Sequence, residues 1–216
     1  MLLDLLLPNR CLHCNRIIPA AMPVCEACEA QIHYTHWNFD GKNPLAQKCR
    51  MLFPTEKAFA LMHFGKEGLS RELIHSLKYR QREILGKMLA ERVAERIVFD
   101  DDKPQLIASV PLHPKKLRQR GYNQLHLFAD ALSEKWKIPH DKNLLKRNIH
   151  KKSQATSKFD ERFKTQNLFS LTKTIENQHI MVVDDVFTTG NTMASIAWEF
   201  LKSEGNRVSV LVMAMD

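Results

Sequence analysis

The sequence predicts an α/β fold in which helices flank a parallel β-sheet, preceded by a small amino-terminal module with four cysteines. The sheet is predicted because short apolar runs alternate along the chain with stretches whose apolar residues recur at helical spacing. The length of 216 residues allows one full-sized domain and a small module. We expect the cysteine module at residues 1–35, a connector at 36–56 and the α/β domain at 57–216.

The strands of the sheet are expected at residues 58–64, 106–110, 179–184 and 207–213, where short apolar runs end at glycine, proline or acidic residues. Helices are expected between and after them, where apolar residues repeat every third or fourth position: 69–77, 84–93, 125–136 and 193–201. Their apolar faces are predicted to form the core. Ligands of parallel sheets collect at the carboxyl ends of the strands, so a binding site is expected there.

The amino-terminal cysteines form two C-x-x-C pairs, Cys11 with Cys14 and Cys25 with Cys28, separated by ten residues. Thiolates are soft ligands, and two such pairs can converge on one tetrahedral ion, for which zinc is the expected metal. Four cysteines fill a closed site, so this zinc is expected to fold the module and not to catalyse. Two disulfides or free thiols are the alternatives. Cys49 lies outside the spacing and is expected to be a buried or idle thiol.

The whole chain has a formal net charge of +8, and its positive charge is concentrated in two segments. Residues 111–124 carry four positive side chains and no acid, and residues 142–164 carry eight positive side chains and two acids. Such local basicity favours an anionic partner. A solvated charged face without a ligand is the alternative.

The first residues are apolar but are not typical of an export signal, because Asp4 stands where such a signal carries a basic residue. No apolar run approaches the roughly 20 residues that cross a bilayer. We therefore expect a short packing helix at the start of a cytoplasmic protein that does not insert into membranes.

A loop rich in threonine and glycine follows the strand at 179–184 and two acids, Asp184 and Asp185. Gly190 lets the backbone turn inward, so that amide groups and hydroxyls converge on an anion at the start of the next helix. The two carboxylates can accept hydrogen bonds from vicinal ribose hydroxyls. A turn with helix caps is the alternative, but all the positions from Val182 to Thr192 together favour a ribose 5-phosphate site.

This stretch resembles the motif of the type I phosphoribosyltransferases, in which four apolar residues precede two acids and a threonine-glycine loop. The resemblance implies that Asp184 and Asp185 hold the ribose hydroxyls of phosphoribosyl pyrophosphate, with Mg²⁺ bound alongside the pyrophosphate. A pyrophosphate loop after an earlier strand is also implied, and residues 109–113 stand in that position. The loop that would wrap the 5-phosphate consists of Thr188, Thr189, Gly190, Asn191 and Thr192.

More of the chain is similar to the ComF proteins (ComFC, GntX-like), a branch of that superfamily named for competence in DNA uptake. The resemblance starts with the four cysteines and includes residues 73–79, residues 110–113 and, as its most distinctive part, residues 118–124 (RQRGYNQ). It continues to the phosphate loop through Arg147, Gln154, Arg162, Asn167 and Phe169. The chain departs from the family at residues 149–153 (IHKKS), where a threonine is usual.

The segment 115–124 also favours an anionic ligand on its own chemistry. Arginines grip phosphates, and an aromatic ring with neighbouring amides can stack on or hydrogen-bond a base. We expect it to fold over the pyrophosphate, to contact single-stranded DNA, or to do both, with a solvated helix amino terminus as the alternative. The residues expected to make these contacts are Lys115, Arg118, Arg120, Tyr122, Asn123 and Gln124.

The sequence leaves three functions open. The ComF resemblance implies a competence protein that handles single-stranded DNA, binds phosphoribosyl pyrophosphate or a related ribose phosphate, and meets proteins of the uptake machinery. The second is an active transferase that moves phosphoribose from phosphoribosyl pyrophosphate to a base or another nucleophile. No segment is typical of a base-binding hood, because the zinc module takes its expected place. The third is a regulator that senses phosphoribosyl pyrophosphate without turning it over.

Overall fold

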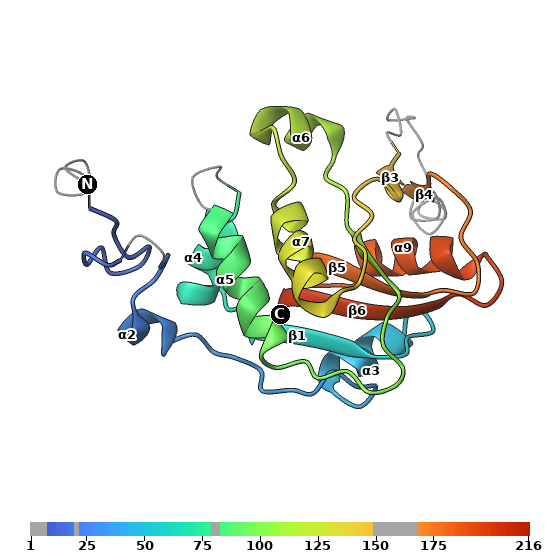
Figure 1. Ribbon diagram of the computed structural model, residues 1–216, viewed down its shortest axis with the longest axis horizontal. Helices are drawn as coiled ribbons and strands as arrows, with labels where there is room; N and C mark the ends of the chain where they lie inside the picture. Colours follow the sequence, from blue (N-terminus) through green and yellow to red (C-terminus); the bar gives the residue numbers. More distant parts are fainter. Residues whose placement is uncertain (1–7, 20–21, 79–82, 149–167) are drawn as a thin grey trace, which may run out of the picture.

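A parallel sheet forms the centre of the computed structural model, which describes residues 8–19, 22–78, 83–148 and 168–216 (Figure 1). Its strand order is β1 (Ala58–His63), β6 (Arg207–Met215), β5 (His179–Phe187) and β2 (Leu106–Ser109). These strands are almost continuously buried, as expected when helices cover both faces of a sheet. The four predicted strands are confirmed; β5 continues through the two acids to Phe187, and β6 continues to Met215.

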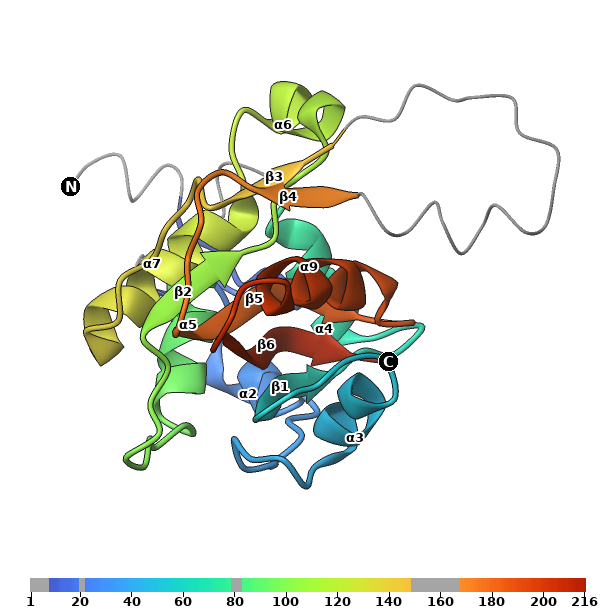
Figure 2. The same ribbon diagram turned by 90° about the vertical axis from the view of Figure 1, so that its right-hand side faces the viewer.

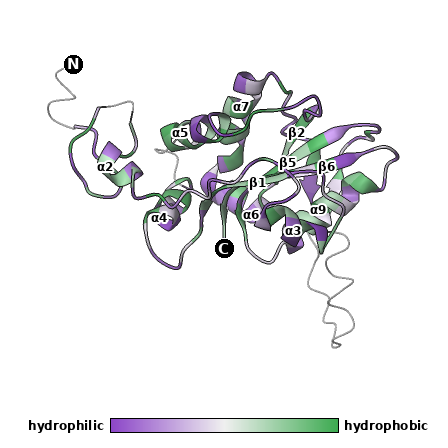
Figure 3. Ribbon diagram, turned by 90° about the horizontal axis from the view of Figure 1, so that it is seen from below, coloured by the Kyte–Doolittle hydropathy of each residue, from purple (hydrophilic) through white to green (hydrophobic). Residues whose placement is uncertain are grey.

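Helices cover the sheet on both faces (Figures 2 and 3). On one face α5 (Glu83–Ala94) packs against α7 (Gln124–Trp136), which contacts β2 and β5. On the other face α3 (Pro44–Arg50) packs on β1, and α9 (Asn191–Leu201) packs on β5 and β6. α4 (Leu69–Ser76) follows β1 and contacts β6. The predicted helices and the predicted fold class are therefore confirmed.

The segment expected as a connector contains the short helix α3. Asn43 caps it by accepting a hydrogen bond from the Ala46 amide, and Pro44 occupies its first turn. Cys49 on this helix is buried, as expected, and burial raises the pKa of its thiol to about 12. Seven residues are too few for an apolar period to be recognised, which is why the sequence did not predict α3.

A further helix and a pair of short strands were not predicted. α6 (Pro114–Arg120) begins after its cap His113, which accepts a hydrogen bond from the Lys115 amide, and ends at Gly121 with φ 75°. The segment 115–124, for which the sequence showed no helical period, is therefore mostly helical. β3 (Leu145–Arg147) and β4 (Phe169–Leu171) form a small antiparallel sheet beside α6 (Figure 2). Strands of three residues are too short to show alternation.

Several expectations concern residues outside the described ranges. They are the packing helix at the start of the chain, most of the basic segment at 142–164, and part of the ComF pattern: Tyr79, Gln154, Arg162 and Asn167. Among the helices that the structure describes, none has the length and apolar character needed to cross a bilayer.

The cysteine module docks at the opposite end of the molecule from β3 and β4 (Figure 1). Its helix α2 (Glu26–Glu29) is joined to α5 by an ion pair between Glu29 and Arg92. His13 Nδ1 lies 2.7 Å from Glu72 Oε2 on α4, and the Thr35 hydroxyl donates to the Ala60 carbonyl at 2.6 Å. Charged and backbone hydrogen bonds thus attach the module to the α/β domain.

Candidate functional site

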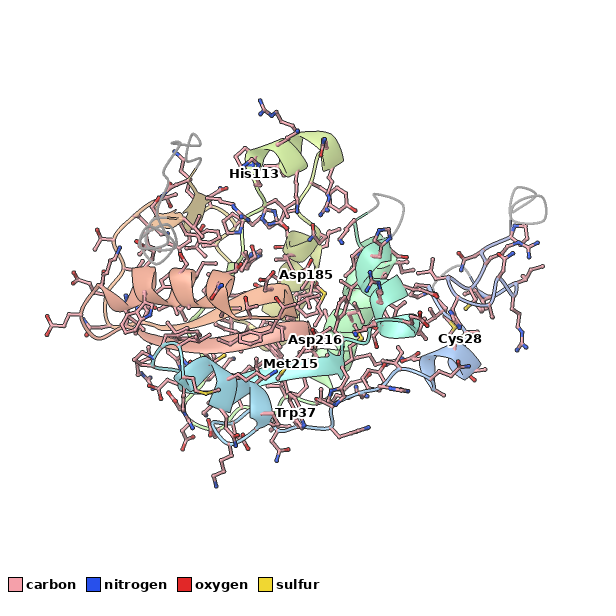
Figure 4. The ribbon with its side chains drawn as sticks, turned by 180° about the vertical axis from the view of Figure 1, so that it is seen from behind. Cys28, Trp37, His113, Asp185, Met215 and Asp216 are labelled. Carbon is pink, nitrogen blue, oxygen red and sulfur yellow. The ribbon has the colours of Figure 1, made fainter. Side chains whose placement is uncertain are left out.

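The two predicted acids lie within the carboxyl end of β5, in the middle of the molecule below α6 (Figure 4). β5 pairs with β6 as far as Phe187, but its pairing with β2 ends at Val183. One edge of β5 therefore loses its neighbour where Asp184 and Asp185 begin. Both side chains are half-buried, so a ligand at the carboxyl edge of the sheet can reach them.

The phosphate loop predicted from the sequence connects β5 to α9. Gly190 ends it with φ 78°, and a Cβ atom there would come within 2.4 Å of Leu52 and 2.7 Å of Phe187. A side chain at this position is excluded both by backbone conformation and by packing. None of the side chains that the structure describes caps the first turn of α9, so its amino terminus is suited to an external anion. The residues lining the hollow at this end include Asp184, Thr188, Thr189, Gly190, Asn191 and Thr192.

The environment of Asp184 is unusual for a carboxyl group. Burial raises its pKa well above the usual range, and the neighbouring Asp185 raises it further. The positive charge of Arg147 on β3 lowers the pKa of Asp184, but by less than burial and Asp185 raise it. A half-buried carboxyl with a raised pKa gains most from a partner that replaces water, such as a ribose hydroxyl or a cation.

Gln124 connects the acid pair to the basic helix. This residue is buried at the start of α7; its Nε2 donates to Asp185 Oδ2 at 3.0 Å, and its Oε1 accepts from Arg120 Nη1 at 3.1 Å. Hydrogen bonds through Gln124 therefore join the segment 118–124 to the acid pair. The sequence placed Gln124 among residues that contact a ligand directly, whereas its amide is already engaged by two protein partners.

The other residues of this segment divide into two groups. The Tyr122 hydroxyl donates to the Leu77 carbonyl at 2.7 Å, and buried Asn123 donates to the Val110 carbonyl and accepts from the Leu125 amide. These two side chains hold the turn between α6 and α7. Lys115 and Arg118 are exposed on α6, and Arg120 is half-buried beside Gln124. Lys115 and Arg118 are therefore accessible to an anionic ligand, and Arg120 is partly accessible.

The predicted pyrophosphate segment, residues 109–113, follows β2 at the same edge of the sheet. Ser109 is buried, and its Oγ lies 3.0 Å from His140 Nε2, while His140 Nδ1 lies 2.9 Å from Asp130 Oδ1. Burial lowers the pKa of His140 more than Asp130 raises it. Because Ser109 is enclosed, this serine, histidine and aspartate support the strand end and are not placed to act as a nucleophile and its base.

A cavity of about 670 Å³ adjoins this segment, and the sequence did not predict it. Its lining residues come from the residues after β2, from α6, from the start of α7, and from β3 with its flanks. The signal in the sequence was the cluster of Lys142, Lys146 and Arg147, which was recognised only as positive charge. The fold brings this cluster against α6.

The four predicted zinc ligands converge. The sulfur atoms of Cys11, Cys14, Cys25 and Cys28 all lie within 4.8 Å of one another, and those of Cys14 and Cys25 are 3.7 Å apart. Tetrahedral zinc with bonds of about 2.3 Å places its sulfurs about 3.8 Å apart, whereas a disulfide bond is about 2.05 Å long. Burial raises the pKa of Cys11, but hydrogen bonds from backbone amides outweigh this and lower it to about 6. The residues therefore fit a structural zinc ion.

Comparisons with known proteins agree with these features. Residues 2–39 match the model of the double zinc ribbon domain, and this stretch holds four cysteines, enough for one tetrahedral zinc. Competence protein F of Haemophilus influenzae is 31% identical over 206 residues, a match that covers 87% of this chain and 89% of the relative. The chain belongs to the competence protein F family. The ComF resemblance predicted from the cysteines and the RQRGYNQ segment is confirmed.

Other relatives of this family member match over shorter stretches. The DNA utilization protein YhgH of Escherichia coli (strain K12) is 32% identical over 147 residues, covering 64% of this chain and 63% of that protein. Competence protein ComFC of Bacillus subtilis is 27% identical over 144 residues, covering 66% and 57%. Similar solved structures include adenine phosphoribosyltransferase of Leishmania tarentolae, with 12% identity, a TM-score of 0.40 and coverage of 83% and 90%.

Proposed function

We propose that this competence protein F family member handles single-stranded DNA in the cytoplasm during natural transformation. In this proposal the phosphate loop and the acid pair hold a ribose 5-phosphate group, which belongs to phosphoribosyl pyrophosphate with Mg²⁺ or to a DNA end. Family membership supports the competence role, and proteins of the uptake machinery are the expected partners.

The observation that carries this proposal is the hydrogen-bonded link from Arg120 through Gln124 to Asp185. The buried amide of Gln124 fixes the basic surface of α6 relative to the acid pair. Such a fixed arrangement favours one ligand that contacts both. Lys115 and Arg118 stand exposed on the same helix as Arg120, where they can neutralise the phosphates of a strand that enters the site.

The test is the salt dependence of binding to a single-stranded oligonucleotide. Replacing Lys115→Ala together with Arg118→Ala should weaken binding and lower the slope of log affinity against log salt by about 1.4, because each phosphate contact contributes roughly 0.7. The control is Lys42→Ala with Lys135→Ala, which removes the same charge from two exposed lysines elsewhere. Equal losses of affinity in both double variants would show that α6 does not contact the DNA.

An active phosphoribosyltransferase is the second candidate, and the completeness of the acid pair and phosphate loop favours it. Such an enzyme would release pyrophosphate from phosphoribosyl pyrophosphate in the presence of Mg²⁺ and an acceptor base. The measurement compares pyrophosphate release by the wild type with that by Asp184→Asn. Equal rates of pyrophosphate release by the two proteins would contradict catalysis. Calorimetry with phosphoribosyl pyrophosphate would then test separately whether the site binds this ligand.

A further inference from the structure

The cavity beside α6 has the chemistry of a site for an aromatic anion. Its walls are largely apolar, with Leu112, Leu117 and Leu145 among them, while Lys142, Lys146 and Arg147 supply positive charge. None of the described residues that line it is acidic. Its volume of about 670 Å³ falls within the range of ligand pockets.

Leu117 is the residue that makes this cavity unusual. Its side chain is 42% exposed on α6, a helix whose other side chains include two lysines and two arginines. An exposed leucine does not stabilise a solvated basic helix, so its place at the border of a cavity indicates a ligand. An apolar ligand surface packed against Leu117 would remove it from water, which favours binding roughly in proportion to the area covered.

The positive residues of the rim differ in what they contact. Lys142 Nζ lies 2.7 Å from Asp130 Oδ2, so its charge is already balanced. No described residue forms an ion pair with Lys146, which is exposed. Arg147 lies over the Phe169 ring, 5.4 Å from its centroid. Lys146 is thus available to a phosphate. The cavity adjoins the acid pair through Asn123, which lines it and directly precedes Gln124, the hydrogen-bond donor to Asp185.

We infer that this cavity takes the base of a nucleotide in single-stranded DNA, next to the nucleotide whose sugar-phosphate lies at the phosphate loop. The inference rests on the proposed function. A base supplies the aromatic face that the leucines and prolines accept, and its phosphodiester supplies the negative charge that Lys146 accepts. A strand is favoured over a free mononucleotide because the exposed Lys115, Lys116 and Arg118 continue the positive surface along α6.

The experiment compares two oligonucleotides of equal length and charge, one a deoxythymidine strand and the other an abasic strand. The wild type should bind the strand with bases roughly ten times more tightly, since base stacking and burial add to affinity that phosphates alone cannot supply. Leu117→Ser should reduce this ratio toward one while leaving affinity for the abasic strand unchanged. Lys146→Ala should weaken binding of both strands by the same factor.

The control is Val98→Ser, which removes another exposed apolar side chain, 88% accessible, outside the cavity lining and should preserve the ratio. Equal affinity of the wild type for both strands would overturn the inference and leave DNA binding intact. Binding of neither strand would contradict the proposed function itself. Deoxythymidine monophosphate that competed as strongly as the oligonucleotide would also overturn the assignment to a strand.

Discussion

The substitution Gln124→Met tests the hydrogen bonds that join residues 118–124 to the acid pair. Methionine has nearly the shape of glutamine but cannot donate to Asp185 Oδ2 or accept from Arg120. Gln124 is only 4% exposed, so water cannot easily replace the lost hydrogen bonds. The carboxylate of Asp185 would then keep its bond from the Val186 amide at 2.8 Å and lose its amide partner from α7.

The size of the effect follows from the charge of the acceptor. A hydrogen bond to a charged group contributes about 1.5–3 kcal/mol to folding, and the Arg120 bond lies nearer the surface and adds less. We expect the free energy of unfolding to fall by about 2 kcal/mol. For a chain of this size that corresponds to a decrease of roughly 4–8 °C in Tm.

The assay is urea unfolding of the zinc-loaded protein, followed by circular dichroism. The matched control is Gln119→Met, which changes an exposed glutamine of the same segment and should stay within about 0.5 kcal/mol of the wild type. If Gln124→Met unfolded at the same urea concentration as the control, Gln124 would not be holding Asp185. The same variants should separate in affinity for ribose 5-phosphate, with only Gln124→Met weakened.

Three other predictions concern ionisation and zinc. Asp184→Asn should stabilise the unliganded protein, because burial and Asp185 raise the pKa of Asp184. The gain should grow as the pH rises above 4 and vanish below it in urea titrations. Burial lowers the pKa of His179 from 6.5, so the unfolded chain takes up a proton at a higher pH than the folded protein does. The free energy of unfolding should therefore decrease as the pH falls below 6.5. His179→Asn should reduce the slope of the free energy of unfolding against pH by up to about 1.4 kcal/mol per pH unit. Elemental analysis should find about one zinc ion per chain, which Cys28→Ser loses and Cys49→Ser retains.

Features encoded by local spacing were predictable from the sequence. The strand and helix periods identified the parallel sheet, and the C-x-x-C pairs identified a zinc site whose sulfurs the structure brings within 4.8 Å. The acids and the phosphate loop are contiguous, so backbone geometry alone places them together at the end of β5. Short elements such as α3, α6, β3 and β4 were not predicted, because they have too few residues to show a period.

The tertiary structure decided which polar side chains are available to a ligand. Tyr122 and Gln124 look equivalent to Arg118 in the sequence, yet their partners are Leu77 and Asp185, which lie 45 and 61 residues away. The cavity beside α6 likewise depends on the fold, which places Leu117 of α6 and Lys146 of β3 in one lining. A sequence pattern records spacing along the chain, whereas these arrangements join residues far apart in the sequence, and only the folded chain specifies them.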